Sequence, residues 1–209
     1  MEHKHIRFPA AGLSFEGILS IPNVTPPTMG GILCHPHPLR GGNMDNHVIV
    51  QLAAEFDQAR IANLRFNFRG VGNSEGSYTE GDLEHNEIIG AQHFLKTYEG
   101  LNIEESFLVG YSFGSRVILK HPESWEGSTK IVLISPQNEA VINSCLHSTN
   151  IPVLIISGSR DHICSINELS EVLETKYSNA KVVEVQGADH FWVGHEAELT
   201  RHIIAFLTR

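Results

Sequence analysis

Cysteine is scarce in this chain of 209 residues, and its placement argues against two kinds of site. The three cysteines, Cys34, Cys145 and Cys164, stand far apart and show none of the paired spacings of a zinc or redox site. Histidine is plentiful, with 13 residues, but no H-x-x-x-H or H-E-x-x-H pattern occurs. We therefore expect reduced, structural cysteines and no metal site.

Long apolar runs and clusters of basic residues are also missing. No segment approaches the roughly 20 apolar residues that span a membrane, and the first residues lack the apolar core of a secretory signal. The formal net charge is -9, and no basic stripe is present to neutralise phosphates. These absences predict a cytoplasmic protein that neither inserts into membranes nor binds nucleic acid, while its oligomeric state stays open.

A phosphate-binding glycine loop is absent as well. The pair Gly70 and Gly72 precedes a polar loop and not a helix, so it does not match a dinucleotide-binding motif. We therefore expect no cofactor.

Short apolar runs alternate with helical patterns along the chain. Such runs are typical of parallel strands buried on both faces, and we expect about eight strands, at residues 31–34, 107–109, 131–134, 153–156, 60–68 and 180–185, with an antiparallel pair at 6–10 and 13–21. Helices are expected at residues 43–59, 82–98, 113–120, 165–177 and 196–207, the first capped by Asn43 or Asp45 and the fourth by Ser165. The alternation predicts one α/β domain, residues 1–209, in which helices cover both faces of a mostly parallel sheet.

The segment Gly110-Tyr111-Ser112-Phe113-Gly114 has the pattern of a nucleophile elbow. It joins an apolar strand-like run to a helix-like run, and its two glycines permit the sharp turn that exposes the serine hydroxyl. A serine held in this way is typical of a nucleophile.

A second match, Gly72-Asn73-Ser74-Glu75-Gly76, lacks this context. Turn-forming residues follow it, without a helical apolar period. We interpret Ser74 as a loop serine whose hydroxyl binds nearby backbone.

A nucleophilic serine requires a base and an acid that orients the base, and in hydrolases with this elbow they follow in the order acid, then histidine. Asp161 comes just after the apolar run 153–156, and His190 just after the strand at 180–185. Both therefore belong at the carboxyl ends of their strands, with Ser112. Glu139 is the rival acid, while Asp189, adjacent to His190 in the chain, is poorly aimed to orient its ring.

An oxyanion hole requires two backbone N–H groups, one of them directly after the nucleophile. Phe113 supplies the first. In the loop at residues 34–42 the prolines have no N–H, so we expect His37 to supply the second, with Leu39 as the alternative.

The chain resembles the α/β-hydrolase superfamily and, within it, the small H-P-H-P hydrolases. The resemblance rests on the elbow, on Cys34-His35-Pro36-His37-Pro38 with the glycines and Asn46 that follow, and on residues 67–74, which are similar to the R-G-x-G-x-S loop of many members. It runs from about Ile6 to Phe206 and implies an α/β-hydrolase fold with Ser112, Asp161 and His190 as the triad.

The connection at residues 135–150 is too short for the large lid that many members carry. We therefore expect a shallow site for a small-molecule acyl substrate, and a serine hydrolase of the carboxylesterase kind that cleaves a small ester, thioester or related bond through an acyl-enzyme. A peptidase or amidase, and a noncatalytic binding protein on the same fold, remain the alternatives.

Overall fold

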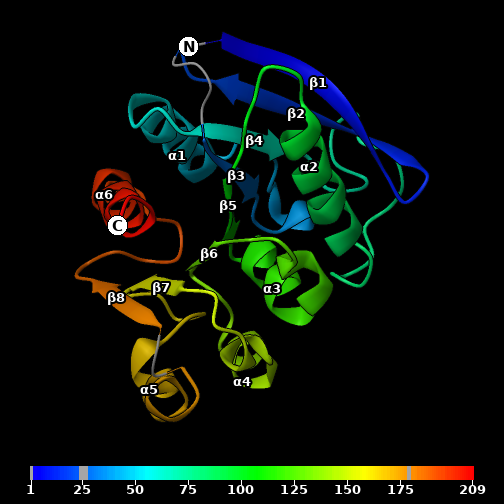
Figure 1. Ribbon diagram of the computed structural model, residues 1–209. Helices are drawn as coiled ribbons and strands as arrows, with labels where there is room; N and C mark the ends of the chain where they lie inside the picture. The colour runs from blue at the N-terminus through cyan, green and yellow to red at the C-terminus, as the bar shows by residue number, and fades with distance from the viewer. Residues whose placement is uncertain (1, 24–27, 178–179) are drawn as a thin grey trace.

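The computed structural model describes residues 2–23, 28–177 and 180–209, and a twisted eight-stranded sheet runs through it (Figure 1). The strand order is β1-β2-β4-β3-β5-β6-β7-β8, and β3 to β8 are parallel to one another. The expected number of strands and the antiparallel pair at the start are confirmed. The strands are β1 (Glu2–Ala10), β2 (Leu13–Ile21), β3 (Met29–Cys34), β4 (Ala62–Phe66), β5 (Glu105–Tyr111), β6 (Lys130–Ile134), β7 (Val153–Gly158) and β8 (Lys181–Val185).

Helices cover both faces of the sheet, as the alternation of patterns predicts (Figure 1). One apolar core lies between the sheet and α1 (His47–Gln58) and α6 (Glu196–Leu207), whose buried residues share one cluster. The second core lies on the other face, under α2 (His85–Thr97), α3 (Phe113–Lys120), α4 (Asn138–Asn143) and α5 (Ile166–Thr175). Because β5, β6 and β7 are apolar and buried between these layers, their carboxyl ends are held in fixed relative positions.

Helix α1 begins later than the sequence predicts, and a different residue caps it. Oδ1 of Asn46 accepts a hydrogen bond from the N–H of Val48 at 3.0 Å. The side chain of Asn43 instead accepts from the N–H of Asp45 at 2.8 Å, and Asp45 pairs with Arg65. The expectation of a cap at Asn43 or Asp45 is therefore wrong, because both side chains are used in the turn before the helix. The expected cap of α5 at Ser165 is confirmed by its bond from the N–H of Glu168 at 3.3 Å.

The connection between β6 and β7 contains no large lid. It holds only α4, which the sequence analysis did not predict, and the single turn η3 (Leu146–Ser148). Val141 and Leu146 are buried in the core beneath, so the connection lies against the body of the molecule. In the described parts of the chain, no helix has the length and hydropathy that crossing a bilayer requires.

Candidate active site

The residue between β5 and α3 is Ser112, and its backbone has the conformation of a sharp turn. Its φ is 51° and its ψ is -103°, values that non-glycine residues rarely adopt. The flanking glycines make the turn possible, since a Cβ on Gly110 would lie 2.5 Å from the N atom of Ser115 and a Cβ on Gly114 would lie 2.4 Å from the carbonyl oxygen of Cys34. The elbow therefore holds Ser112 at the carboxyl end of the sheet, with α3 packed closely behind it.

His190 lies beside this serine. Its Nε2 is 3.0 Å from Oγ of Ser112, a hydrogen-bond distance at which a base can accept the hydroxyl proton. The hydroxyl of Tyr111 donates to the carbonyl of His190 at 2.7 Å and so ties the loop after β8 to the end of β5. The sequence analysis did not assign Tyr111 a role, because a bond to backbone leaves no pattern in the residue types.

Asp161 completes the arrangement from the loop after β7. Its Oδ2 and Oδ1 lie 2.9 Å and 3.1 Å from Nδ1 of His190. Oδ1 also accepts from the N–H groups of Ile163 at 2.9 Å and Cys164 at 3.0 Å. Burial alone would raise the pKa of Asp161, but the bonds from His190 and Cys164 outweigh it and hold the pKa below its ordinary value. The carboxylate is therefore ionised and aimed at the imidazole.

The rival acids lie elsewhere or have other partners. Glu139 lies in the first turn of α4 and makes no hydrogen bond with His190 in the described residues. Asp189 accepts through Oδ1 from the N–H groups of Phe191 and Trp192, at 2.9 Å and 3.2 Å, and so shapes the turn that follows. Of the carboxylates considered, Asp161 alone contacts the ring of His190.

Ser74, the serine of the second motif match, is part of a loop, as predicted. Its hydroxyl donates to the carbonyl of Asn67 at 2.7 Å and accepts from the N–H of Glu16 at 3.1 Å. The bond from Glu16 joins this loop to β2, and the bond to Asn67 holds the loop to the segment that follows β4.

The loop after β3 places its backbone next to the elbow. The ring of His37 lies 5.4 Å from that of Phe113, measured between centroids. In the described part of the chain, the N–H groups of these two residues donate to no protein acceptor. The N–H of Leu39 is already committed, because it donates to Nδ1 of His37 at 3.2 Å. This bond disfavours Leu39 as the second donor.

The rings of His35 and His37 serve different parts of this loop. Nε2 of His35 accepts from the N–H of Phe68 at 3.1 Å, and its Nδ1 lies 2.6 Å from the carbonyl of Pro36. Burial lowers the pKa of His35 to about 4, so this ring is neutral near pH 7. The ring of His37 bonds to the hydroxyl of Tyr78 at 3.1 Å. Each imidazole is thus satisfied by protein groups.

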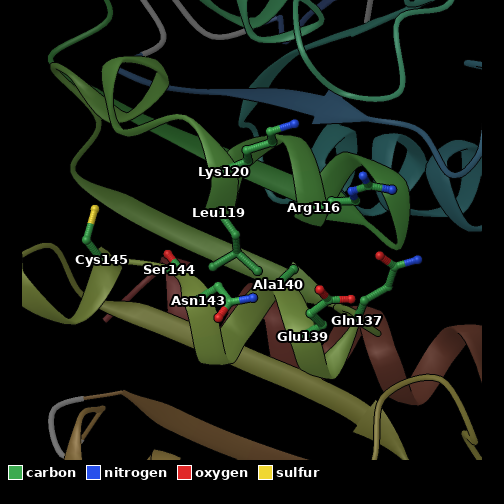
Figure 2. Close-up of a pocket in the computed structure, with 9 residues that line it drawn as sticks. All are labelled: Arg116, Leu119, Lys120, Gln137, Glu139, Ala140, Asn143, Ser144 and Cys145. Carbon is green, nitrogen blue, oxygen red and sulfur yellow. The ribbon is translucent and has the colours of Figure 1, made fainter.

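A cavity of about 400 Å³ lies between α3 and α4 (Figure 2). Arg116, one turn along α3 from Ser112, lies at one end with Gln137, and Cys145 lies at the other end. None of the triad side chains lines this cavity. No sequence pattern indicates this cavity, because α4, which forms one wall, was not predicted.

The sequence matches one protein family and one curated relative over most of its length. A sequence model of the family described as "Alpha/beta hydrolase domain" matches residues 33–202. An uncharacterized protein from Rickettsia prowazekii, RP471, is 29% identical over 188 residues, which is 84% of this chain and 77% of that protein.

Two solved structures are similar over nearly the whole chain. An alpha-beta serine hydrolase homologue from Coxiella burnetii superposes with a TM-score of 0.85 at 26% identity, covering 98% of this chain and 97% of the other. XC6422 from Xanthomonas campestris, described as a serine hydrolase without lid, superposes with a TM-score of 0.86 at 24% identity, covering 100% and 95%.

Proposed function

The chain belongs to the alpha/beta hydrolase family, and we propose that it is a serine hydrolase in which Ser112, His190 and Asp161 form the catalytic triad. One observation carries this proposal. A continuous chain of hydrogen bonds runs from Oγ of Ser112 through both ring nitrogens of His190 to the buried carboxylate of Asp161. The three residues come from loops at the carboxyl ends of β5, β7 and β8, where ligands bind in α/β sheets.

In the first half-reaction, Oγ of Ser112 attacks the acyl carbonyl of the substrate while Nε2 of His190 takes its proton. Asp161 keeps Nδ1 of His190 protonated and stabilises the imidazolium that forms. The negative charge that develops on the carbonyl oxygen is received by the N–H groups of Phe113 and His37. His190 then returns the proton to the leaving group, and an acyl-enzyme remains.

In the second half-reaction, water attacks the acyl-enzyme. His190 accepts a proton from the water and then protonates Oγ of Ser112, which releases the acid product. The same acid and base therefore serve both halves.

The short connection between β6 and β7 supports the proposed substrate class. With only α4 and η3 in that connection, few residues are available to enclose a long acyl chain. A small carboxylic ester, a thioester or a related acyl compound suits such a site. Arg116 lies one turn along α3 from Ser112 and lines the cavity beside that helix (Figure 2), so the proposal directs one side of the substrate toward this cavity.

The proposal is tested by labelling the protein with a fluorophosphonate probe and locating the adduct by mass spectrometry. We expect an adduct on Ser112, none in Ser112→Ala, and turnover of p-nitrophenyl esters that declines as the acyl chain lengthens. Absence of labelling in folded protein would overturn the proposal in favour of a noncatalytic binding protein. Faster turnover of amides than of matched esters would indicate an amidase.

A further inference from the structure

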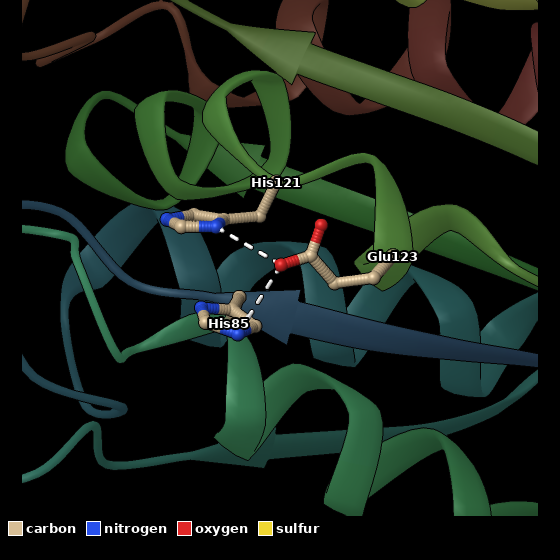
Figure 3. Close-up of side chains that lie close together, drawn as sticks. All are labelled: His85, His121 and Glu123. Carbon is tan, nitrogen blue, oxygen red and sulfur yellow. Dashed lines mark hydrogen bonds and ion pairs between the residues drawn. The ribbon is translucent and has the colours of Figure 1, made fainter.

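Two histidines and a glutamate from separate segments gather beside α2 and α3 (Figure 3). His85 is the first residue of α2, His121 follows the last residue of α3, and Glu123 lies in the turn η2 (Pro122–Trp125). One ligand atom from each residue lies within 4.8 Å of the other two. Oε1 of Glu123 is 3.3 Å from Nε2 of His85 and 3.2 Å from Nδ1 of His121.

The hydrogen bond made by Nε2 of His121 determines whether its Nδ1 carries a proton or a lone pair. Nε2 of His121 lies 2.7 Å from the carbonyl of Gly81, which accepts only if Nε2 carries the proton. In the neutral ring, Nδ1 then directs a lone pair at Oε1 of Glu123. Two acceptors at 3.2 Å repel each other unless a positive species lies between them. The arrangement therefore calls for a cation or an additional proton at Nδ1.

The second ring limits how many protons this cluster can hold. The rings of His85 and His121 are stacked, with centroids 4.0 Å apart and planes inclined by 18°. Both side chains are largely buried, with exposed fractions of 14% and 15%. Protonating both rings would place two positive charges face to face with little solvent to screen them. A single divalent ion instead satisfies both imidazoles and the carboxylate together.

We propose that His85, His121 and Glu123 bind one divalent transition-metal ion, for which Zn²⁺ is the best match. Two imidazoles and a carboxylate form a common ligand set for zinc, with water available for the fourth position. The carbonyl of Gly81 holds the outer nitrogen of His121, as second ligand shells usually do for metal-bound histidines. This site goes beyond the proposed hydrolase function and does not depend on it.

The distances from Oε1 of Glu123 to the two nitrogens suit a tetrahedral ion, whereas the two rings must move to bind it. Bonds of about 2.0–2.1 Å hold the ligand atoms of such an ion about 3.3 Å apart, close to the separations of Oε1 from the two nitrogens. The stacked rings must turn and separate, because two imidazoles on one tetrahedral ion have centroids about 5 Å apart. The half-exposed carboxylate of Glu123 is free to follow this movement.

Such an ion would cross-link the start of α2 to the end of α3. The ligands are separated by 36 positions in the chain, from His85 to His121, so no local spacing in the sequence indicates the site. The expectation of no metal site rested on the absence of such a local spacing. Because the ion binds the folded chain and not the unfolded one, it should raise the melting temperature.

The proposal is tested by titrating the metal-free full-length protein with ZnCl₂ in a calorimeter and by measuring its melting temperature with and without ZnCl₂. We expect one saturable site per chain and a higher melting temperature when Zn²⁺ is bound. His85→Gln, His121→Gln and Glu123→Gln should each weaken binding by about tenfold or more. His202→Gln is the matched control, since His202 faces Glu198 at 3.9 Å on α6 without a third ligand, and it should bind Zn²⁺ as the wild type does.

Two outcomes would overturn the proposal. One is the absence of saturable binding in folded wild-type protein, and the other is unchanged binding in both histidine variants. Melting curves without metal show whether each variant folds, and Glu123→Gln is the mildest change because this side chain is half exposed. A nitrogen NMR spectrum gives a second readout, in which Zn²⁺ should shift Nδ1 of His121 and leave its Nε2 protonated. A spectrum unaltered by Zn²⁺ would also refute the site.

Discussion

The indole N–H of Trp192 donates a hydrogen bond to the hydroxyl of Ser135 at 3.0 Å, in the interior beside the candidate triad. Both residues are fully buried, and both have positive φ, 62° for Trp192 and 47° for Ser135. The bond joins the loop that carries His190 to the end of β6. Burial acts to raise the pKa of Asp161, but bonds from His190 and Cys164 lower it more, and the hydroxyl of Ser135 makes a further, smaller contribution that favours the ionised form. We therefore expect Ser135 and Trp192 to act as positioning residues for the candidate triad.

A double-mutant cycle should measure this bond. Ser135→Ala leaves a buried indole N–H without an acceptor and should lower the free energy of unfolding by about 1–3 kcal/mol. Trp192→Phe removes the donor and part of the packing. In the double variant the two losses should fall short of additive by about 1 kcal/mol, as urea unfolding would show. Strict additivity would mean that the bond contributes nothing.

Two substitutions at Ser112 should distinguish the effect of its hydroxyl on turnover from the effect of its strained backbone on stability. Both Ser112→Ala and Ser112→Gly should abolish ester turnover, because neither has a nucleophile. Ser112→Gly should be the more stable of the two by about 1 kcal/mol, since glycine adopts the positive φ of 51° without a clash. Thermal unfolding provides the measurement, and retained turnover in either variant would remove Ser112 from its proposed role.

The acid of the triad can be identified by paired isosteric variants. Asp161→Asn should reduce kcat by about 10⁴-fold, as a neutral amide orients the imidazole in the wrong tautomer. Glu139→Gln should retain activity near that of the wild type, because Glu139 has no bond to His190. Steady-state assays of both proteins decide the assignment, and the reverse pattern would transfer the role to Glu139.

Acid should destabilise the protein through His35. In the folded state its pKa is lowered to about 4 by burial, whereas in an unfolded chain histidine titrates near about 6.5. Above the unfolded value both states are neutral and the full stability is present. As the pH falls from about 6.5 to 4, only the unfolded state gains the proton, so about 3 kcal/mol is lost over this range.

Urea unfolding of the wild type and His35→Gln between pH 7 and pH 4 would measure this effect. Glutamine retains an acceptor for the N–H of Phe68 but does not titrate. The variant, although less stable at pH 7, should lose less free energy of unfolding on acidification. Equal losses would show that His35 is not the group responsible.

The number of strands, the mostly parallel sheet and the meeting of Ser112, Asp161 and His190 at one edge were predictable because the signals are local. Each of Ser112, Asp161 and His190 directly follows a strand, and parallel strands bring their carboxyl ends to one edge. The helix at 113–120 was predicted with its observed bounds for the same reason, since the elbow fixes its start.

Other features depend on contacts that no local pattern reveals. Helix α4 has only six residues, too few for a helical period to be recognised. The cap of α1 depends on which of three neighbouring polar residues is free. Asp45 pairs with Arg65, 20 positions away, whereas Asn43 forms a local turn with Asp45. The bond between Ser135 and Trp192 requires an unusual backbone at both residues, and neither is a glycine that would indicate it.

The wall of the cavity between α3 and α4 gives the protein a built-in attachment point for a reporter group. Cys145 lines that cavity and is exposed, whereas Cys34 and Cys164 are buried, and burial raises the pKa of the Cys164 thiol to about 12. Thiolates are the reactive species in alkylation, so a maleimide dye should attach to Cys145 alone. A fluorophore at this position would test whether candidate ligands enter the cavity, without any engineered cysteine.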